Sequence, residues 1–124
     1  MFQSLWRAWG IKKDLAKLRA TVYHGLSNEI PFRLNRMAKV VTIHDLIFLK
    51  HKEQYSFADR SIYEIKTRYA AKHADKIIAV SRQTKNDLIE LYQVPEDNIV
   101  VIPPLISNYF TKPAMRRGTI AGYQ

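Results

Sequence analysis

Three pairs of residues with usable chemistry follow directly after apolar, β-branched runs: His44-Asp45, His24-Gly25 and Ser81-Arg82. The imidazole of His44 can donate a hydrogen bond to a phosphate or exchange one with a hydroxyl, and Asp45 can accept one from a hydroxyl. His24 offers the same chemistry beside a glycine that allows close backbone approach. Ser81 begins a helical pattern, and a helix N-terminus can hold an anion.

Each of these positions also has an ordinary structural interpretation. His44 can be a loop histidine that is tied to the backbone, Gly25 a turn glycine after a strand, and Ser81 a helix N-cap without a ligand. Seen one at a time, these structural interpretations are the commoner ones.

The runs before these residues predict the strands that would position them. Apolar β-branched or aromatic segments predict strands at 21–24, 39–43, 76–80 and 98–102. The segment 39–43 is of the kind that is buried on both faces of a parallel sheet. Residues 26–37 have a loop composition, and a second apolar patch follows at 46–49.

Helical periodicity fills the gaps between the later strands. A helix is expected at 59–74 with Asp59 as N-cap, and another at 82–93, ended by Pro95. Their predicted buried residues are Ile62, Ile65, Tyr69 and Ala70 in the first, and Thr84, Leu88, Leu91 and Tyr92 in the second. The apolar phase of residues 5–18 changes at Gly10, which predicts two short helices meeting there or one helix packed on both sides.

Strands alternating with helices predict an α/β fold, a Rossmann-like parallel sheet with flanking helices. In such open sheets ligands bind outside the carboxyl ends of the strands, where His24, His44 and Ser81 are expected. The basic group Lys50, His51 and Lys52 would lie on the same side and could contact a phosphate, or it is a solvated loop.

Composition limits the classes of function. A chain of 124 residues has room for one domain, and its formal charge of +9 favours anionic partners. It has no cysteine, and its four histidines form no zinc-binding spacing. Dinucleotide, P-loop and serine-nucleophile motifs are absent from the sequence. The basic residues are dispersed, so no nucleic-acid partner is expected.

Three blocks in order carry a family resemblance. Residues 23–31 (YHGLSNEIP), 41–49 (VTIHDLIFL) and 74–81 (ADKIIAVS), the last with 84–88 (TKNDL), resemble the N-terminal, acceptor-side domain of family-4 (group 1) glycosyltransferases of the GT-B fold. The resemblance covers roughly residues 4–102. It implies a retaining hexosyltransferase that moves a mannose- or glucose-like sugar from a nucleotide-sugar to an acceptor bound by this domain.

The resemblance also assigns residues. His44 matches the family histidine near the transferred sugar, so it is the implied catalytic residue. His24, Gly25, Asp45, Ser81 and Thr84 match positions that line the acceptor cleft. No metal and no cofactor are implied beyond the nucleotide-sugar co-substrate, because the family's C-terminal domain neutralises the leaving diphosphate.

Departures from the family pattern predict an incomplete domain. Residues 1–104 are expected to form a partial N-terminal domain, truncated at both ends and inactive without a nucleotide-sugar domain. Residues 105–124 are expected to be a poorly ordered tail at the start of an interdomain connection. The expected partners are a sugar, glycan or lipid-linked acceptor and the missing C-terminal domain, in the cytoplasm, with peripheral contact with anionic membrane. The alternatives are a non-catalytic basic module for anionic membrane or nucleic acid, and a remnant without function.

Overall fold

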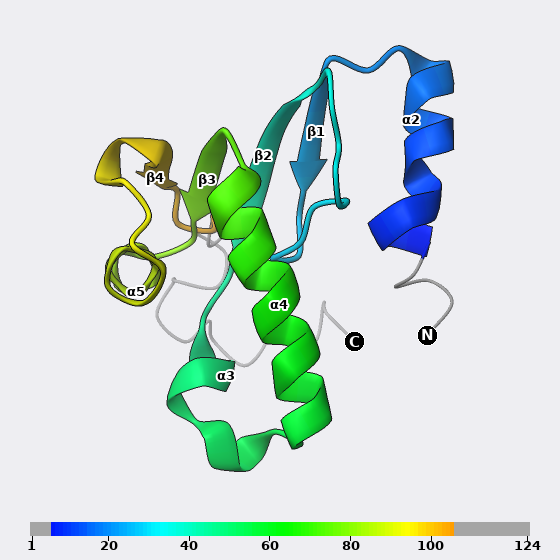
Figure 1. Ribbon diagram of the computed structural model, residues 1–124. Helices are drawn as coiled ribbons and strands as arrows, with labels where there is room; N and C mark the ends of the chain where they lie inside the picture. The colour runs from blue at the N-terminus through cyan, green and yellow to red at the C-terminus, as the bar shows by residue number, and fades with distance from the viewer. Residues whose placement is uncertain (1–5, 106–124) are drawn as a thin grey trace, which may run out of the picture.

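A four-stranded parallel sheet with the strand order β1-β2-β3-β4 forms the centre of the molecule (Figure 1). The computed structural model of the chain describes residues 6–105. The strands are β1 (Val22–Gly25), β2 (Ala38–Ile43), β3 (Lys76–Ala79) and β4 (Ile99–Val101). All four lie within two residues of their predicted ends, and the α/β class with a Rossmann-like parallel sheet is confirmed.

Two helices connect the later strands and pack on the sheet. α4 (Phe57–His73) joins β2 to β3 beyond a short connection, and α5 (Arg82–Tyr92) joins β3 to β4. Both contribute to one apolar core with the same face of the sheet. Its fully buried strand residues are Val41, Ile43, Ile77 and Ala79, and its helix residues include Ala70, Ala71, Leu88 and Tyr92.

The opposite face of the sheet carries similar residues in a different setting. Val22 of β1 is 56% exposed and Val100 of β4 is 48% exposed. Val40 and Thr42 of the central strand β2 are half-buried. Segment 39–43 was predicted to be buried on both faces of the sheet. Within the part of the chain that the structure describes, it is fully buried on the face that α4 and α5 cover and only half-buried on the other.

The helix over 59–74 was expected to begin one turn later than it does. Ser56, not Asp59, is the N-cap, because its side chain accepts a hydrogen bond from the backbone N–H of Asp59 at 3.2 Å. Its hydroxyl also donates to Asp59 Oδ2 at 2.7 Å. The N-cap prediction was wrong because Ser56 can make the same cap, and Asp59 then occupies the third helical position.

The predicted buried faces of both helices need correction. Ile62 and Ile65 are 53% and 61% exposed, whereas the sheet-facing stripe of α4 consists of Thr67, Ala70 and Ala71. In α5, Leu91 is 38% exposed and Asp87 takes a buried place beside Thr84, Leu88 and Tyr92. Small residues let a helix approach a sheet closely, and this stripe decides which side of α4 faces inward.

Of the two alternatives predicted for residues 5–18, the structure shows two short helical segments that meet at Gly10. A single π-helical segment, η1 (Trp6–Gly10), precedes α2 (Ile11–Leu18), and a π turn adds a residue that shifts the helical phase. The two segments together, which we call the η1–α2 arm, lie beside β1 (Figure 1). The rings of Trp9 and Phe32 lie 5.7 Å apart, and the Arg7 guanidinium pairs with Glu29 at 2.7 Å.

The remaining elements are short: α3 (Ile47–Lys50), η2 (Lys52–Gln54) and η3 (Glu96–Asn98). The predicted tail lies almost wholly outside the described residues. Among residues 6–105, no helix is long and apolar enough to cross a membrane.

Candidate functional site

Asn28 joins the loop after β1 to the end of β2. Its backbone N–H donates to the Thr42 carbonyl at 3.1 Å, and its side-chain Oδ1 accepts from the backbone N–H of His44 at 2.8 Å. Its Nδ2 donates to the carbonyl of Asp45 at 3.3 Å. Asn28 has a φ of 59°, a left-handed conformation that asparagine tolerates better than most residues. One residue thus fixes the backbone on both sides of the His44 side chain.

The ring of His44 is held in one tautomer. Its Nε2 lies 2.7 Å from the carbonyl oxygen of Leu26, and a carbonyl can only accept, so Nε2 carries the proton. Within residues 6–105, no group binds Nδ1. In the neutral ring Nδ1 therefore keeps an exposed lone pair that can accept a hydrogen bond from a ligand hydroxyl.

Thr84 and Ser81 hold the same segment from the α5 side. The Thr84 hydroxyl donates a hydrogen bond to the carbonyl of His44 at 3.1 Å. This bond uses the single proton of the hydroxyl. Ser81 Oγ, 3.0 Å from Thr84 Oγ1, must then be the donor in that contact. Ser81 also accepts from the backbone N–H of Thr84 at 3.1 Å, as an N-cap serine does. Both residues position His44, and Thr84 is buried.

Gly25 and His24 end β1 in different ways. A Cβ atom added to Gly25 would collide with the backbone oxygen of Glu29, so the glycine is required for the tight loop that follows. His24 Nε2 lies 2.7 Å from Thr42 Oγ1, across the face of the sheet that α4 and α5 do not cover.

Asp45 is the one predicted site residue that lines either of the two hollows described next. Its Oδ1 accepts from the backbone N–H of Ile47 at 3.2 Å and so supports the start of α3. Its other oxygen has no hydrogen-bond partner within residues 6–105.

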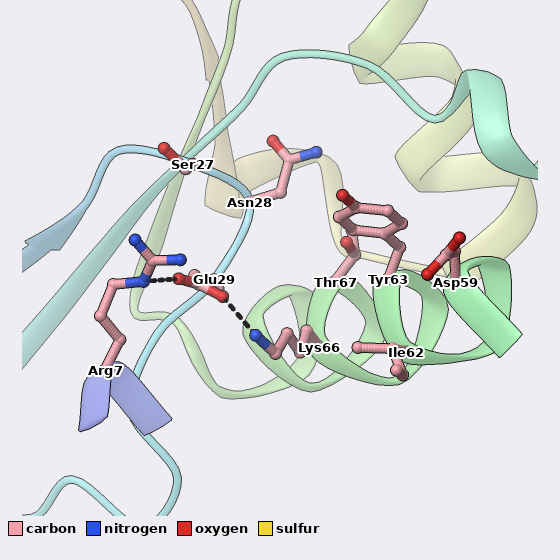
Figure 2. A pocket seen from close by; sticks show the side chains of 9 residues that line it. All are labelled: Arg7, Ser27, Asn28, Glu29, Asp59, Ile62, Tyr63, Lys66 and Thr67. Atoms are coloured by element: carbon pink, nitrogen blue, oxygen red, sulfur yellow. Dashed lines mark hydrogen bonds and ion pairs between the residues drawn. The ribbon is translucent and has the colours of Figure 1, made fainter. Parts of the chain in front are cut away.

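Two hollows lie between the loop after β1 and α4. The larger, of about 310 Å³, is drawn in Figure 2 and is lined by Arg7, by Ser27, Asn28 and Glu29 of the loop, and by Asp59, Ile62, Tyr63, Lys66 and Thr67. The smaller, of about 180 Å³, is lined by Asn28, Asp45, Phe48, Tyr55 and Tyr63. Asn28 and Tyr63 line both, so we call the two hollows together the α4 groove.

Glu29 organises the charges of the α4 groove. One carboxylate oxygen pairs with Arg7 at 2.7 Å and the other with Lys66 at 2.9 Å (Figure 2). Lys66 and Glu29 are each about one-fifth exposed, which weakens solvent screening of their pair. Burial, reinforced by the Glu29 charge, raises the pKa of nearby Tyr23.

Lys50 and His51, two of the three basic residues predicted to contact a phosphate, pair with acidic side chains of the protein. Lys50 Nζ pairs with the buried Asp87 at 2.7 Å, and His51 Nδ1 lies 3.5 Å from Glu53. Lys50, His51 and Lys52 do not line the α4 groove. Within residues 6–105, no cluster of three histidine or acidic side chains could hold a metal ion.

Sequence reasoning missed Asn28 and Tyr63 as site residues. Asn28 was placed in a loop by composition, and Tyr63 lies on a helix whose inward side was assigned to other residues. A usable signal was present for Asn28, since an asparagine after a strand and a glycine often adopts the left-handed conformation and binds backbone groups.

The parallel sheet, its helices and the His44 network at the strand ends define a Rossmann-like α/β domain of the GT-B N-terminal type. The family model for Glycosyltransferase Family 4 matches residues 2–107, and the chain belongs to this family. Comparison with curated proteins gave no match.

Proposed function

We propose that the chain is the acceptor-side part of a retaining hexosyltransferase that transfers a mannose- or glucose-like unit from a nucleotide-sugar. Membership of Glycosyltransferase Family 4 supports transfer of a sugar. The observation that carries the assignment is His44, whose backbone N–H, carbonyl and ring are each bound by a different residue. Such preorganisation is what a group that orients a reacting sugar requires.

In the proposed reaction, the bond between the anomeric carbon and the phosphate oxygen breaks, and a bond from that carbon to an acceptor oxygen forms on the same face. The leaving diphosphate takes the electron pair of the broken bond and the proton that the acceptor hydroxyl gives up. His44 Nδ1 accepts a hydrogen bond from a hydroxyl of the transferred sugar, while its Nε2–H stays on Leu26. Asp45, His24 and Gly25 contribute to the acceptor side of the cleft, and Ser81 and Thr84 position the His44 carbonyl.

His44→Ala tests this role in an active enzyme that contains these residues. We expect the rate of transfer to fall by about two orders of magnitude or more, since an oriented polar group contributes that much. The circular dichroism spectrum should not change, because the side chain of His44 is exposed. His73→Ala is the matched control, because His73 is exposed at the C-terminal end of α4 and lies outside the His44 network. Near-normal transfer by His44→Ala would remove His44 from the site.

We also propose that the 124-residue chain is inactive alone and that a second domain binds the nucleotide-sugar. Incubating the chain with UDP-glucose or GDP-mannose and a panel of acceptors should give no glycosylated product. Turnover by the chain alone would contradict this part of the proposal.

Peripheral membrane contact on the cytoplasmic face is a second candidate property, favoured by the η1–α2 arm. Trp6, Trp9 and Leu18 are 50%, 55% and 74% exposed beside the exposed cations Lys13 and Lys17. Exposed tryptophan and leucine beside lysine are the pattern of helices that lie in a lipid interface. Vesicles with anionic lipid should bind the chain in a salt-dependent way, and Lys13→Glu with Lys17→Glu should abolish the binding.

The transfer assay and the binding assay also distinguish the proposed transferase from the alternative, a non-catalytic basic binding module. If His44→Ala leaves transfer unchanged while anionic vesicles or DNA bind with a steep salt dependence, the chain is a basic binding module.

A further inference from the structure

The α4 groove is acidic in a basic chain. Its lining side chains carry two positive charges, on Arg7 and Lys66, and three negative charges, on Glu29, Asp45 and Asp59. The whole chain has a formal charge of +9. The lining of the groove therefore differs in sign from the chain as a whole, and this difference bears directly on which ligands the groove can take.

Both cations of the groove are committed to the protein. Glu29 holds Arg7 with one carboxylate oxygen and Lys66 with the other. A phosphate entering here would meet two cations whose charge Glu29 already offsets, while Asp45 and Asp59 repelled it. The groove is consequently a poor place for a phosphorylated ligand.

The polar groups that stay available are those that bind hydroxyls. Asp45 uses Oδ1 on Ile47, and Asp59 uses Oδ2 on Ser56, so each keeps one carboxylate oxygen without a partner within residues 6–105. Asn28 uses one of its two Nδ2 protons on the Asp45 carbonyl and keeps the second. Carboxylate acceptors next to an amide donor suit a ligand whose hydroxyls both donate and accept.

Aromatic rings form the wall on the α3 side. Phe48 and Tyr63 lie with their ring centroids 6.2 Å apart, and Tyr55 lines the same hollow. Tyr63 also lines the larger hollow, whose volume of about 310 Å³ is at the low end of the range for small-molecule sites. Rings beside polar acceptors fit a compact ligand with an apolar face and a hydroxylated edge, which is the chemistry of a pyranose.

We propose that the α4 groove binds a neutral pyranose and discriminates against sugars that carry phosphate on that ring. Its identification as the acceptor subsite rests on the proposed function, whereas the binding itself does not. An acceptor recognised here presents an uncharged sugar ring to the domain, whatever is attached to that ring elsewhere.

The binding is tested on the full 124-residue chain with methyl α-mannopyranoside, methyl α-glucopyranoside and mannose 6-phosphate as probes. In two-dimensional NMR titrations, at least one neutral glycoside should shift the Asn28 side-chain amide and the backbone amides of 27–29 and 59–63. Mannose 6-phosphate should bind more weakly by about fivefold or more at low salt. Equal or tighter binding of the phosphorylated sugar, or no shifts with either glycoside, would overturn the proposal.

Variants that keep the side-chain volumes locate the site. Asp45→Asn and Tyr63→Phe should each weaken binding of the neutral glycoside by about two- to tenfold, the effect of one hydrogen bond. Tyr92→Phe is the matched control, because its hydroxyl is buried, lacks a partner and lies outside the groove lining. Equal loss of binding in the control and in Tyr63→Phe would place the sugar elsewhere.

Failure of this inference and failure of the proposed function can be told apart. Glycoside binding needs no donor and no transfer, so near-normal transfer by His44→Ala would overturn the proposed role of His44 and leave the predicted glycoside binding intact. Conversely, an active enzyme that transfers to an acceptor while Tyr63→Phe leaves both glycoside binding and the KM for that acceptor unchanged would overturn the groove and keep the transferase.

Discussion

The two faces of the sheet are built from the same kind of residue but have different surroundings. On the covered face, Val41, Ile43 and Ile77 are completely buried against α4 and α5. On the open face, Val22 and Val100 are about half exposed. Strand composition alone does not tell which face a helix covers, because β-branched residues occupy both.

The candidate functional residues also lie on different sides of the sheet. His24 belongs to the open face and bonds Thr42, whereas the α4 groove is built on the covered side from the β1 loop, α3 and α4. Asn28 and Thr84 hold His44 between the two. The covered side thus supplies the rigid supports, and substitutions there should have the larger effects.

Adjacent isoleucines of β3 give the largest contrast. Ile77 is on the covered face with no exposure, and Ile78 is half-buried on the open face. Ile77→Ala should lower the free energy of unfolding by about 2–5 kcal/mol, and Ile78→Ala by about 1 kcal/mol. Urea denaturation of both variants measures the difference. Equal losses would mean that the open face is packed as tightly as the covered one.

Gly25 and Gly10, the two glycines within residues 6–105, make the next comparison. Gly25→Ala should destabilise the chain by about 1–3 kcal/mol, because the new methyl group would meet the fixed backbone of Glu29. Gly10→Ala is the control, since its Cβ would approach the exposed Trp6 ring, at 2.6 Å, which can move. We expect a change within about 0.5 kcal/mol there. A tolerated Gly25→Ala would show that the β1 loop adapts, and Asn28 would then not be a rigid support.

Two substitutions at Asn28 separate the contribution of its left-handed backbone conformation from that of its side-chain hydrogen bonds. Asn28→Gly keeps the left-handed backbone accessible but removes the amide, and should cost about 1–2 kcal/mol. Asn28→Ala adds the strain of a left-handed alanine, about 1 kcal/mol more. In an active enzyme both variants should reduce the transfer rate, since the His44 backbone loses its Oδ1 partner. Unchanged transfer in Asn28→Gly would show that His44 is positioned without this residue.

Particular residues show what the sequence could predict. The four strands were placed correctly because each β-branched run ends at glycine, proline or a polar residue. Burial in α4 was misassigned because its inward stripe is Thr67, Ala70 and Ala71, residues that periodicity ranks below Ile62 and Ile65. Small side chains win there because the sheet comes close.

The candidate site likewise has a part that the sequence could predict and a part that it could not. Positions at strand ends are readable from the sequence, so His44 and Asp45 were placed there, and their functional roles stay predictions. The α4 groove was not, because its lining comes from the η1 segment, two loops, α3 and α4, and only tertiary packing brings Asn28 to Tyr63. The pairing of Arg7 and Lys66 with Glu29, which sets the groove's charge, likewise joins residues far apart in the chain.

Control substitutions aside, the smallest expected effect at neutral pH belongs to Tyr92, at the α4–α5 contact of the covered side. Its buried hydroxyl has no partner within residues 6–105, so Tyr92→Phe should change the free energy of unfolding by about 0–1 kcal/mol, toward greater stability. Burial, with a further contribution from Glu64 against the opposing charge of Arg68, raises the pKa of Tyr92 to about 12.

This raised pKa makes the substitution informative at high pH. The unfolded tyrosine ionises near pH 10 and the folded one near 12, so the native protein loses stability as the pH rises between these values. Tyr92→Phe should lose less over that interval, and the gap between the two proteins should widen from pH 9.5 to 12 in urea denaturation. Parallel pH profiles would mean that the phenol reaches water in the native state, and that the covered side is looser at α5 than its apolar contacts indicate.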